Sequence, residues 1–89
     1  MIEKQLTIIN KLGLHARAAA KLVKLCSSFT ADIEIQKEDK KVNCKSIMGV
    51  MMLAASRGSE ITLTANGEDE TAAINAVCHL IEDRFGEDE

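Results

Sequence analysis

The spacing of the apolar residues changes several times along this chain, and these changes restrict the folds open to it. Apolar and polar residues alternate over residues 4–9, 31–37 and 61–65, a pattern typical of strands with one buried face. A short return strand over 41–43 is expected to follow the second of these through a turn at 38–40. Four strands are therefore predicted, each with one apolar side.

Between the strands, the apolar residues recur at the 3.6-residue period of an α-helix. Helices are predicted over residues 16–27, 46–53 and about 69–84, the last ended by Gly86. The positions expected to face the core in the first helix are Ala16, Ala19, Ala20, Val23 and Cys26, flanked by Leu22 and Leu25. Those of the third helix are Ile74, Val77, Cys78, Ile81 and Phe85.

The predicted order of elements is β-α-β-β-α-β-α, in an α/β (α+β) domain. One-sided alternation in every strand indicates an antiparallel sheet with one apolar face under helices and one face in water. We therefore expect an open-faced β-sandwich with a four-stranded antiparallel sheet and three helices on one face. Eighty-nine residues leave no room for a second core, so residues 1–89 are expected to form a single domain.

Composition argues against several classes of function. A net charge of −3 and an aromatic content of 2% disfavour nucleic acid as a partner. No apolar run approaches the roughly 20 residues of a membrane span, and Glu3 and Lys4 interrupt any signal peptide. We therefore expect a cytoplasmic protein with no membrane insertion. The three cysteines lack a Cys-x-x-Cys pair, which favours buried thiols over a metal site or a disulfide framework.

Residues 13–22 place His15 where a loop ends and an alanine-rich helix begins. The first N–H groups of a helix have no intrahelical acceptor and the helix dipole is positive there, so negative charge is stabilised. The same field disfavours protonation of the imidazole, and we expect His15 to be neutral and nucleophilic near pH 7. Arg17 can offer a charge-assisted donor fork to phosphate. Together these groups are suited to holding a phosphoryl group.

Leu14-His15-Ala16-Arg17 resembles the active-site motif of the HPr family, the histidine-containing phosphocarriers of the bacterial phosphotransferase system. A second segment, Lys-Ser-Ile-Met-Gly-Val-Met at residues 45–51, resembles the regulatory-serine segment of the same family. The two motifs lie at the separation expected for the family, and the resemblance spans nearly the whole chain. The open-faced sandwich is also the fold that the family implies.

The resemblance implies that His15 carries the phosphoryl group on Nδ1 (the pros nitrogen), and that Arg17 stabilises it. The backbone N–H groups of Ala16 and Arg17 would bind its oxygens. The group would come from phospho-enzyme I and pass to an enzyme IIA domain, in transient complexes of a monomeric carrier that holds no cofactor and no metal. Many members have proline where this chain has Ala18, so we expect a slightly less rigid helix start.

Two roles are expected for Ser46. A serine before a helix is a favoured N-cap, and the resemblance adds phosphorylation by an HPr kinase/phosphorylase as a regulatory modification. The residues expected to dock the partners are Ile47, Met48, Met51, Lys21 and Lys24. Val50 and Leu53 are expected in the core, while the exposure of Met52 is left open.

Each of these assignments has a plainer alternative. His15 alone could be a capping or surface histidine, and any single lysine could belong to a solvated helix face. His79 is expected to face solvent without a role, and the acidic tail from Glu87 is expected to be a frayed end. Two other functions stay open, namely a carrier of a purely regulatory, nitrogen-type branch and an unrelated small α/β binding module. Sugar specificity is not encoded in this chain.

Overall fold

The structure is a computed structural model, and it describes residues 1–87. Its elements, in chain order, are β1 (Ile2–Thr7), α1 (Ala16–Ser27), β2 (Asp32–Lys37), β3 (Lys40–Asn43), α2 (Ile47–Met52), β4 (Glu60–Asn66), α3 (Glu70–Glu82) and a short terminal turn, η1 (Arg84–Gly86). The predicted order is confirmed. The first strand lies two residues earlier than predicted, and the last helix ends at Glu82 rather than at Arg84.

The four strands form one antiparallel sheet in the order β1-β4-β2-β3. The central strand β4 pairs Ile61 with Leu6 of β1 and Leu63 with Ile35 of β2, so the apolar residues of neighbouring strands share one face. Side chains of alternate residues point to opposite faces of a strand, and the other face therefore carries the polar set.

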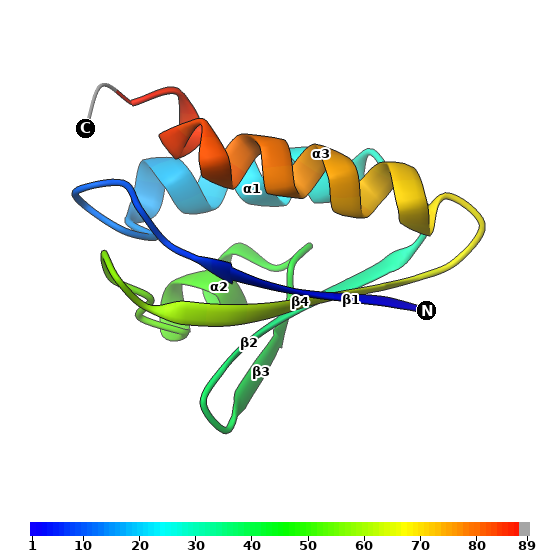
Figure 1. Cartoon of the computed structure of the whole chain (residues 1–89), viewed down its shortest axis with the longest axis horizontal. Helices are drawn as coiled ribbons and strands as arrows, with labels where there is room; N and C mark the ends of the chain where they lie inside the picture. The colour runs from blue at the N-terminus through cyan, green and yellow to red at the C-terminus, as the bar shows by residue number, and fades with distance from the viewer. Residues whose placement is uncertain (88–89) are drawn as a thin grey trace.

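The helices cover the apolar face of the sheet, as predicted. In Figure 1, α1 and α3 run side by side above the strands, and the two helices are in contact. Helix α2 contacts α1 and β3. A single buried cluster joins all three helices to the sheet, with Leu22, Val50 and Val77 each fully buried on a different helix. This burial of apolar surface is the main source of stability for a domain of this size.

The predicted inner face of α1 is partly wrong. Ala16 and Ala20 are exposed, whereas Ala18 and Leu22 are fully buried together with Ala19 and Cys26. Alanine is small enough to lie on either side of a helix, so an alanine-rich run does not define the buried side by itself. The large side chain of Leu22 gains most from burial, and its packing sets the rotation of the helix.

The predicted apolar stripe of α3 is confirmed, because Ile74, Val77, Cys78, Ile81 and Phe85 are all buried. Phe85, however, lies outside the helix. It belongs to η1, in which Arg84 and Phe85 both have φ of 55° and Gly86 has φ of 77°. Three consecutive residues in this left-handed region turn the chain sharply after α3.

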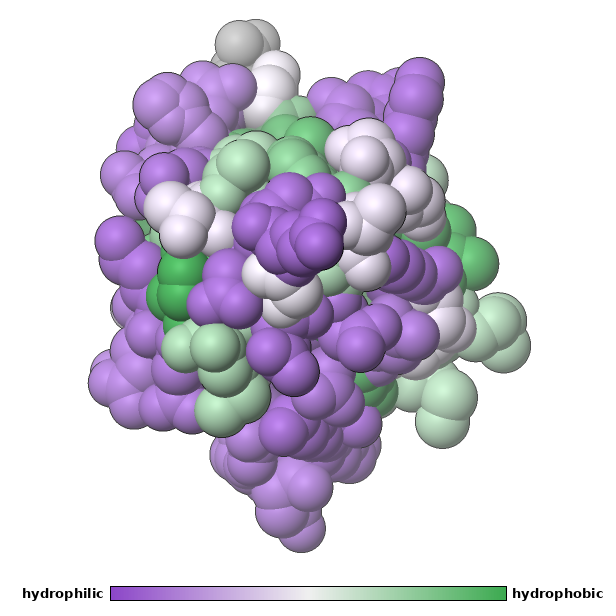
Figure 2. Space-filling model, turned by 90° about the vertical axis from the view of Figure 1, so that its right-hand side faces the viewer, coloured by the Kyte–Doolittle hydropathy of each residue, from purple (hydrophilic) through white to green (hydrophobic). Residues whose placement is uncertain are grey.

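All three cysteines are buried and free, and the hydrogen bond with Cys26, followed by burial, raises the pKa of Cys44. No helix within residues 1–87 is long and apolar enough to cross a membrane. Figure 2 shows the end of the molecule at the right of Figure 1, where hydrophilic side chains make up most of the surface.

Candidate functional site

The loop between β1 and α1 is held against the segment that joins α2 to β4. The Leu14 N–H donates to the Ala55 carbonyl over 2.8 Å, and the Ile8 N–H donates to the Ser59 carbonyl over 2.9 Å. Gly13 has φ of +64°, and a Cβ at this position would lie 2.5 Å from the Ala55 carbonyl oxygen. Only glycine satisfies both the backbone conformation and the close approach, so this contact fixes where α1 begins.

His15 is the N-cap residue of α1, as the sequence predicts. Its backbone is extended, with φ of −74° and ψ of 177°, and its side chain makes no capping hydrogen bond. No described residue accepts a hydrogen bond from the N–H groups of Ala16, Arg17 or Ala18. The half-buried imidazole therefore lies beside three N–H donors that have no acceptor within residues 1–87, at the positive end of a 12-residue helix.

Two further residues contact this histidine site, and sequence reasoning assigned neither of them to it. Asn10 is fully buried, and its Nδ2 donates to the Gly13 carbonyl over 2.8 Å and to Glu87 Oε1 over 2.9 Å. The other carboxylate oxygen of Glu87 contacts His15 Nε2. The hydrogen bonds from Asn10 and then from His15 hold the pKa of Glu87 below its ordinary value.

The expectation that the tail frays from Glu87 onward is therefore wrong for Glu87, while residues 88 and 89 lie outside the described residues. The η1 turn directs the chain back toward α1, and Phe85 anchors it in the core. A weak signal for this anchor existed in the sequence, because Phe85 continues the apolar stripe beyond the last regular turn of α3. The acidic residues that follow Phe85 instead led to the prediction of a frayed end.

The three basic residues predicted near the site all lie exposed on α1. Arg17 forms no hydrogen bond or ion pair with residues 1–87, so its guanidinium is available to an incoming group. Lys21 has a further contact that the sequence did not predict, because its ammonium donates to the Phe85 carbonyl over 2.6 Å. It thus supports the η1 turn as well as the basic surface. Lys24 lies in the last turn of the helix.

Ser46 is the N-cap of α2, and its Oγ accepts the Gly49 N–H over 3.2 Å, which confirms its predicted capping role. The residues of α2 divide as expected. Val50 and Leu53 are buried. The exposed apolar residues of the helix are Ile47, Met48, Met51 and Met52, at 42%, 69%, 43% and 69% exposure. Met52, left open by the sequence, therefore belongs to the exposed set.

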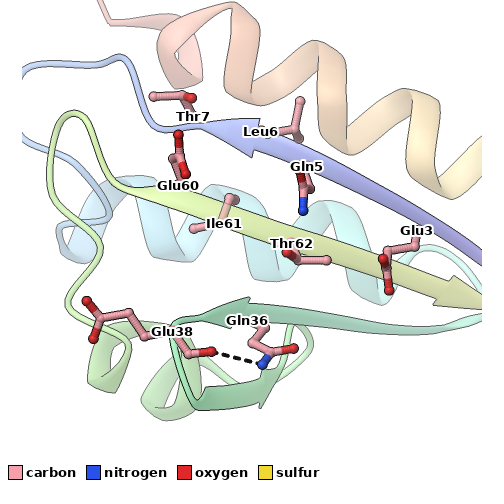
Figure 3. A pocket seen from close by; sticks show the side chains of 9 residues that line it. All are labelled: Glu3, Gln5, Leu6, Thr7, Gln36, Glu38, Glu60, Ile61 and Thr62. Atoms are coloured by element: carbon pink, nitrogen blue, oxygen red, sulfur yellow. Dashed lines mark hydrogen bonds between the residues drawn. The ribbon is translucent and has the colours of Figure 1, made fainter.

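Two surface hollows of the molecule lie away from His15. One is on the open face of the sheet, where Glu3 and Gln5 of β1, Glu60 and Thr62 of β4 and Gln36 of β2 surround it (Figure 3). A second lies between α1 and α3, lined by Leu25, Leu80 and the exposed His79. Neither hollow includes His15, Arg17 or Ser46. Within residues 1–87 no three His, Cys, Asp or Glu side chains are placed to hold a metal ion.

A family model described as "PTS HPr component phosphorylation site" matches residues 2–83, which include both sequence motifs. The chain belongs to the HPr family. Members of the family that resemble it over their full length include phosphocarrier protein HPr of Cupriavidus necator, 52% identical over 89 residues and 100% of both chains.

A second curated relative is phosphocarrier protein NPr of Shewanella violacea, which is 48% identical over 86 residues, 97% of this chain and 94% of the relative. Among solved structures, HPr-C-His from Thermoanaerobacter tengcongensis superposes with a TM-score of 0.97 at 49% identity, with complete coverage of both chains. The resemblance in sequence and the open-faced sandwich are thereby confirmed.

Proposed function

We propose that His15 is the phosphoryl-accepting residue of this HPr-family phosphocarrier, receiving the group from enzyme I and passing it to an enzyme IIA domain. One observation carries the proposal. The imidazole lies at a helix N-terminus with three free N–H donors, and within residues 1–87 only its Nε2 has a partner. Nδ1, the ring nitrogen nearer the backbone, is therefore left to act as the nucleophile.

The transfer exchanges one nitrogen–phosphorus bond for another. The Nδ1 lone pair of His15 forms a bond to phosphorus while the phosphorus–nitrogen bond of the donor breaks, and its electron pair returns to the donor imidazole. The second transfer repeats this exchange toward the IIA histidine. Positioning and electrostatic stabilisation dominate such reactions, which agrees with a site built from helix N–H groups. No metal or cofactor of the carrier takes part in this scheme.

In this proposal Arg17 stabilises the charge of the phosphoryl oxygens, together with the N–H groups of Ala16 and Arg17. Its exposure and its lack of a protein partner within the described residues support this role. A guanidinium that is already ion-paired would have to break that contact before binding phosphate. A free one can form a charge-assisted hydrogen bond directly.

The partners are proposed to dock on the exposed apolar surface of α2 and the basic residues of α1. Helix α2 contacts α1, so both sets belong to adjoining elements. Ile47, Met48 and Met51 are exposed despite their apolar character, which is typical of an interaction surface. Flexible methionines suit a surface that must fit several partners in turn. Lys24 provides a rim charge that can steer an acidic partner.

Ser46 is proposed to be a regulatory phosphorylation site for an HPr kinase. Its hydroxyl caps α2 immediately before the apolar docking residues. A phosphate at this position adds about −1.5 to −2 charges at the edge of the surface that the partners must cover. The modification would then reduce docking without unfolding the helix, because an anion is tolerated at a helix N-terminus.

A carrier of a regulatory, nitrogen-type branch is the second candidate, favoured by the 48% identity with an NPr protein. The chemistry at His15 would be the same, and only the partner proteins would differ. Purified enzyme I proteins and IIA domains of the sugar and nitrogen types, tested side by side, separate the two branches by their relative transfer rates.

The proposal for His15 is tested by incubating the protein with enzyme I and phosphoenolpyruvate and measuring acid-labile phosphate by mass. His15→Ala should fold normally and accept none. His79→Ala, which removes the other, exposed histidine, is the matched control and should be labelled as the wild type is. Full labelling of His15→Ala would assign the phosphoryl group to a different residue. The family match already excludes the unrelated binding module. A wild-type protein that accepts no phosphate would therefore refute the proposed phosphocarrier role of His15.

A further inference from the structure

The end of the chain is built to hold one carboxylate against His15. Three contacts fix the left-handed turn after α3. The Phe85 side chain is fully buried, the Phe85 carbonyl accepts a hydrogen bond from Lys21, and Asn10 holds Glu87. Arg84 and Phe85 both have φ of 55°, a conformation that is uncommon for non-glycine residues. The turn therefore serves to place Glu87 beside the start of α1.

The Asn10 amide can be oriented in only one way at this site. Its Nδ2 lies between two acceptors, the Gly13 carbonyl and Glu87 Oε1, at 2.8 and 2.9 Å. A flipped amide would place its oxygen against both of these acceptors and lose both hydrogen bonds. The orientation with Nδ2 toward the carboxylate leaves Oδ1 buried without a partner among the described residues. Leaving a buried acceptor unpaired costs free energy, and the site retains it in order to hold Glu87.

Each oxygen of Glu87 then has its own donor. Oε1 accepts from Asn10 and Oε2 contacts Nε2 of His15. Because an ionised carboxylate can only accept hydrogen bonds, Nε2 must carry the proton. A neutral imidazole has a single N–H, so the lone pair is confined to Nδ1.

We propose that Glu87 is a positioning residue for phosphoryl transfer, which keeps Nε2 of His15 protonated and presents the Nδ1 lone pair to the donor. The inference rests on the proposed function of His15. Nε2–H stays bonded to the carboxylate while the Nδ1–phosphorus bond forms. As Nδ1 shares its lone pair, the ring gains positive charge, which the carboxylate offsets from the far side. Nε2 lies across the ring from the new bond, so the carboxylate does not compete with the phosphoryl oxygens.

A nuclear magnetic resonance measurement on the unphosphorylated protein tests the contact itself. In wild-type protein labelled with ¹⁵N, we expect a slowly exchanging, downfield proton on Nε2 of His15. Glu87→Ala should lose this signal, and Glu87→Gln, which keeps an acceptor but not the charge, should weaken it. Asn10→Ala should weaken it as well, because the carboxylate loses the amide that orients it. Glu68→Ala, an exposed carboxylate that precedes α3, is the matched control and should retain the signal.

The rate of phosphoryl acceptance from enzyme I tests the consequence. A lost charge-assisted contact predicts a fall of about tenfold or more for Glu87→Ala, a smaller fall for Glu87→Gln and none for Glu68→Ala. Far-ultraviolet circular dichroism and the melting temperature should show all of these variants folded. If Glu87→Ala keeps the Nε2–H signal, or loses it with an unchanged rate, the proposal is overturned. A wild-type protein that shows the signal but takes no phosphate would instead refute the role of His15.

Discussion

Replacing Ser46 by aspartate and by alanine should separate its capping role from its regulatory role. The Ser46 hydroxyl accepts one hydrogen bond, from the Gly49 N–H over 3.2 Å. Alanine removes this acceptor, and the loss of an N-cap costs about 0.5–2 kcal/mol, typically ~1. For a domain of this length, ~1 kcal/mol corresponds to roughly 4–8 °C in melting temperature. Aspartate keeps an acceptor at the cap, so its melting temperature should lie within a few degrees of wild type.

The order of the transfer rates should be the reverse. Ser46→Ala leaves Ile47, Met48 and Met51 unchanged and adds no charge, so it should accept phosphate from enzyme I at the wild-type rate. Ser46→Asp places a carboxylate at the edge of this apolar surface, which a docking partner must desolvate or meet with its own charges. We expect its rate to fall by roughly tenfold, or about 1.4 kcal/mol.

The assay is the initial rate of phosphoryl transfer from enzyme I at subsaturating carrier, with all three proteins in the same salt. Thermal unfolding of the same samples gives the stability order. Raising the salt concentration should narrow the difference in rate, because exposed charges are screened. Equal rates for Ser46→Asp and Ser46→Ala would refute the reasoning and leave Ser46 as a helix cap alone.

Three other side chains give predictions of their own. Arg17→Ala should slow transfer by about tenfold or more at an unchanged melting temperature, because a contact to phosphate is lost but none within the described protein. Phe85→Ala should lower the free energy of unfolding in urea by about 3–5 kcal/mol, because this side chain is fully buried. Hydrogen bonds with Asn10 and then with His15 lower the pKa of Glu87 in the folded protein. The stabilisation that these bonds provide is therefore complete above the unfolded pKa of about 4.3 and is lost as the pH falls through the folded pKa. Urea unfolding of wild type and Glu87→Gln should therefore differ at pH values above about 4.3 and converge as the pH falls below that value.

The chain's own pattern determines the elements and the nature of the core. Alternation identified three strands, because each exposes one face to water, and the turn at 38–40 identified the fourth as a return strand. The stripe of α3 matched the buried set from Ile74 to Ile81. The position of His15 at the start of α1 was likewise predictable, because the loop ending in Gly13 and the alanine-rich run after it are both local signals. Such signals act over a few residues and need no knowledge of the packing.

Tertiary structure alone decided which side of α1 is buried and what contacts His15. Leu22 rather than the alanines set the rotation of α1, since several alanine-rich faces are equally apolar until the helix packs on the sheet. Glu87 meets His15 across 72 residues of chain and Asn10 across 77. No periodicity carries information over that separation. The contact exists because α3 spans the domain and the buried Phe85 turns the chain back toward the start of α1.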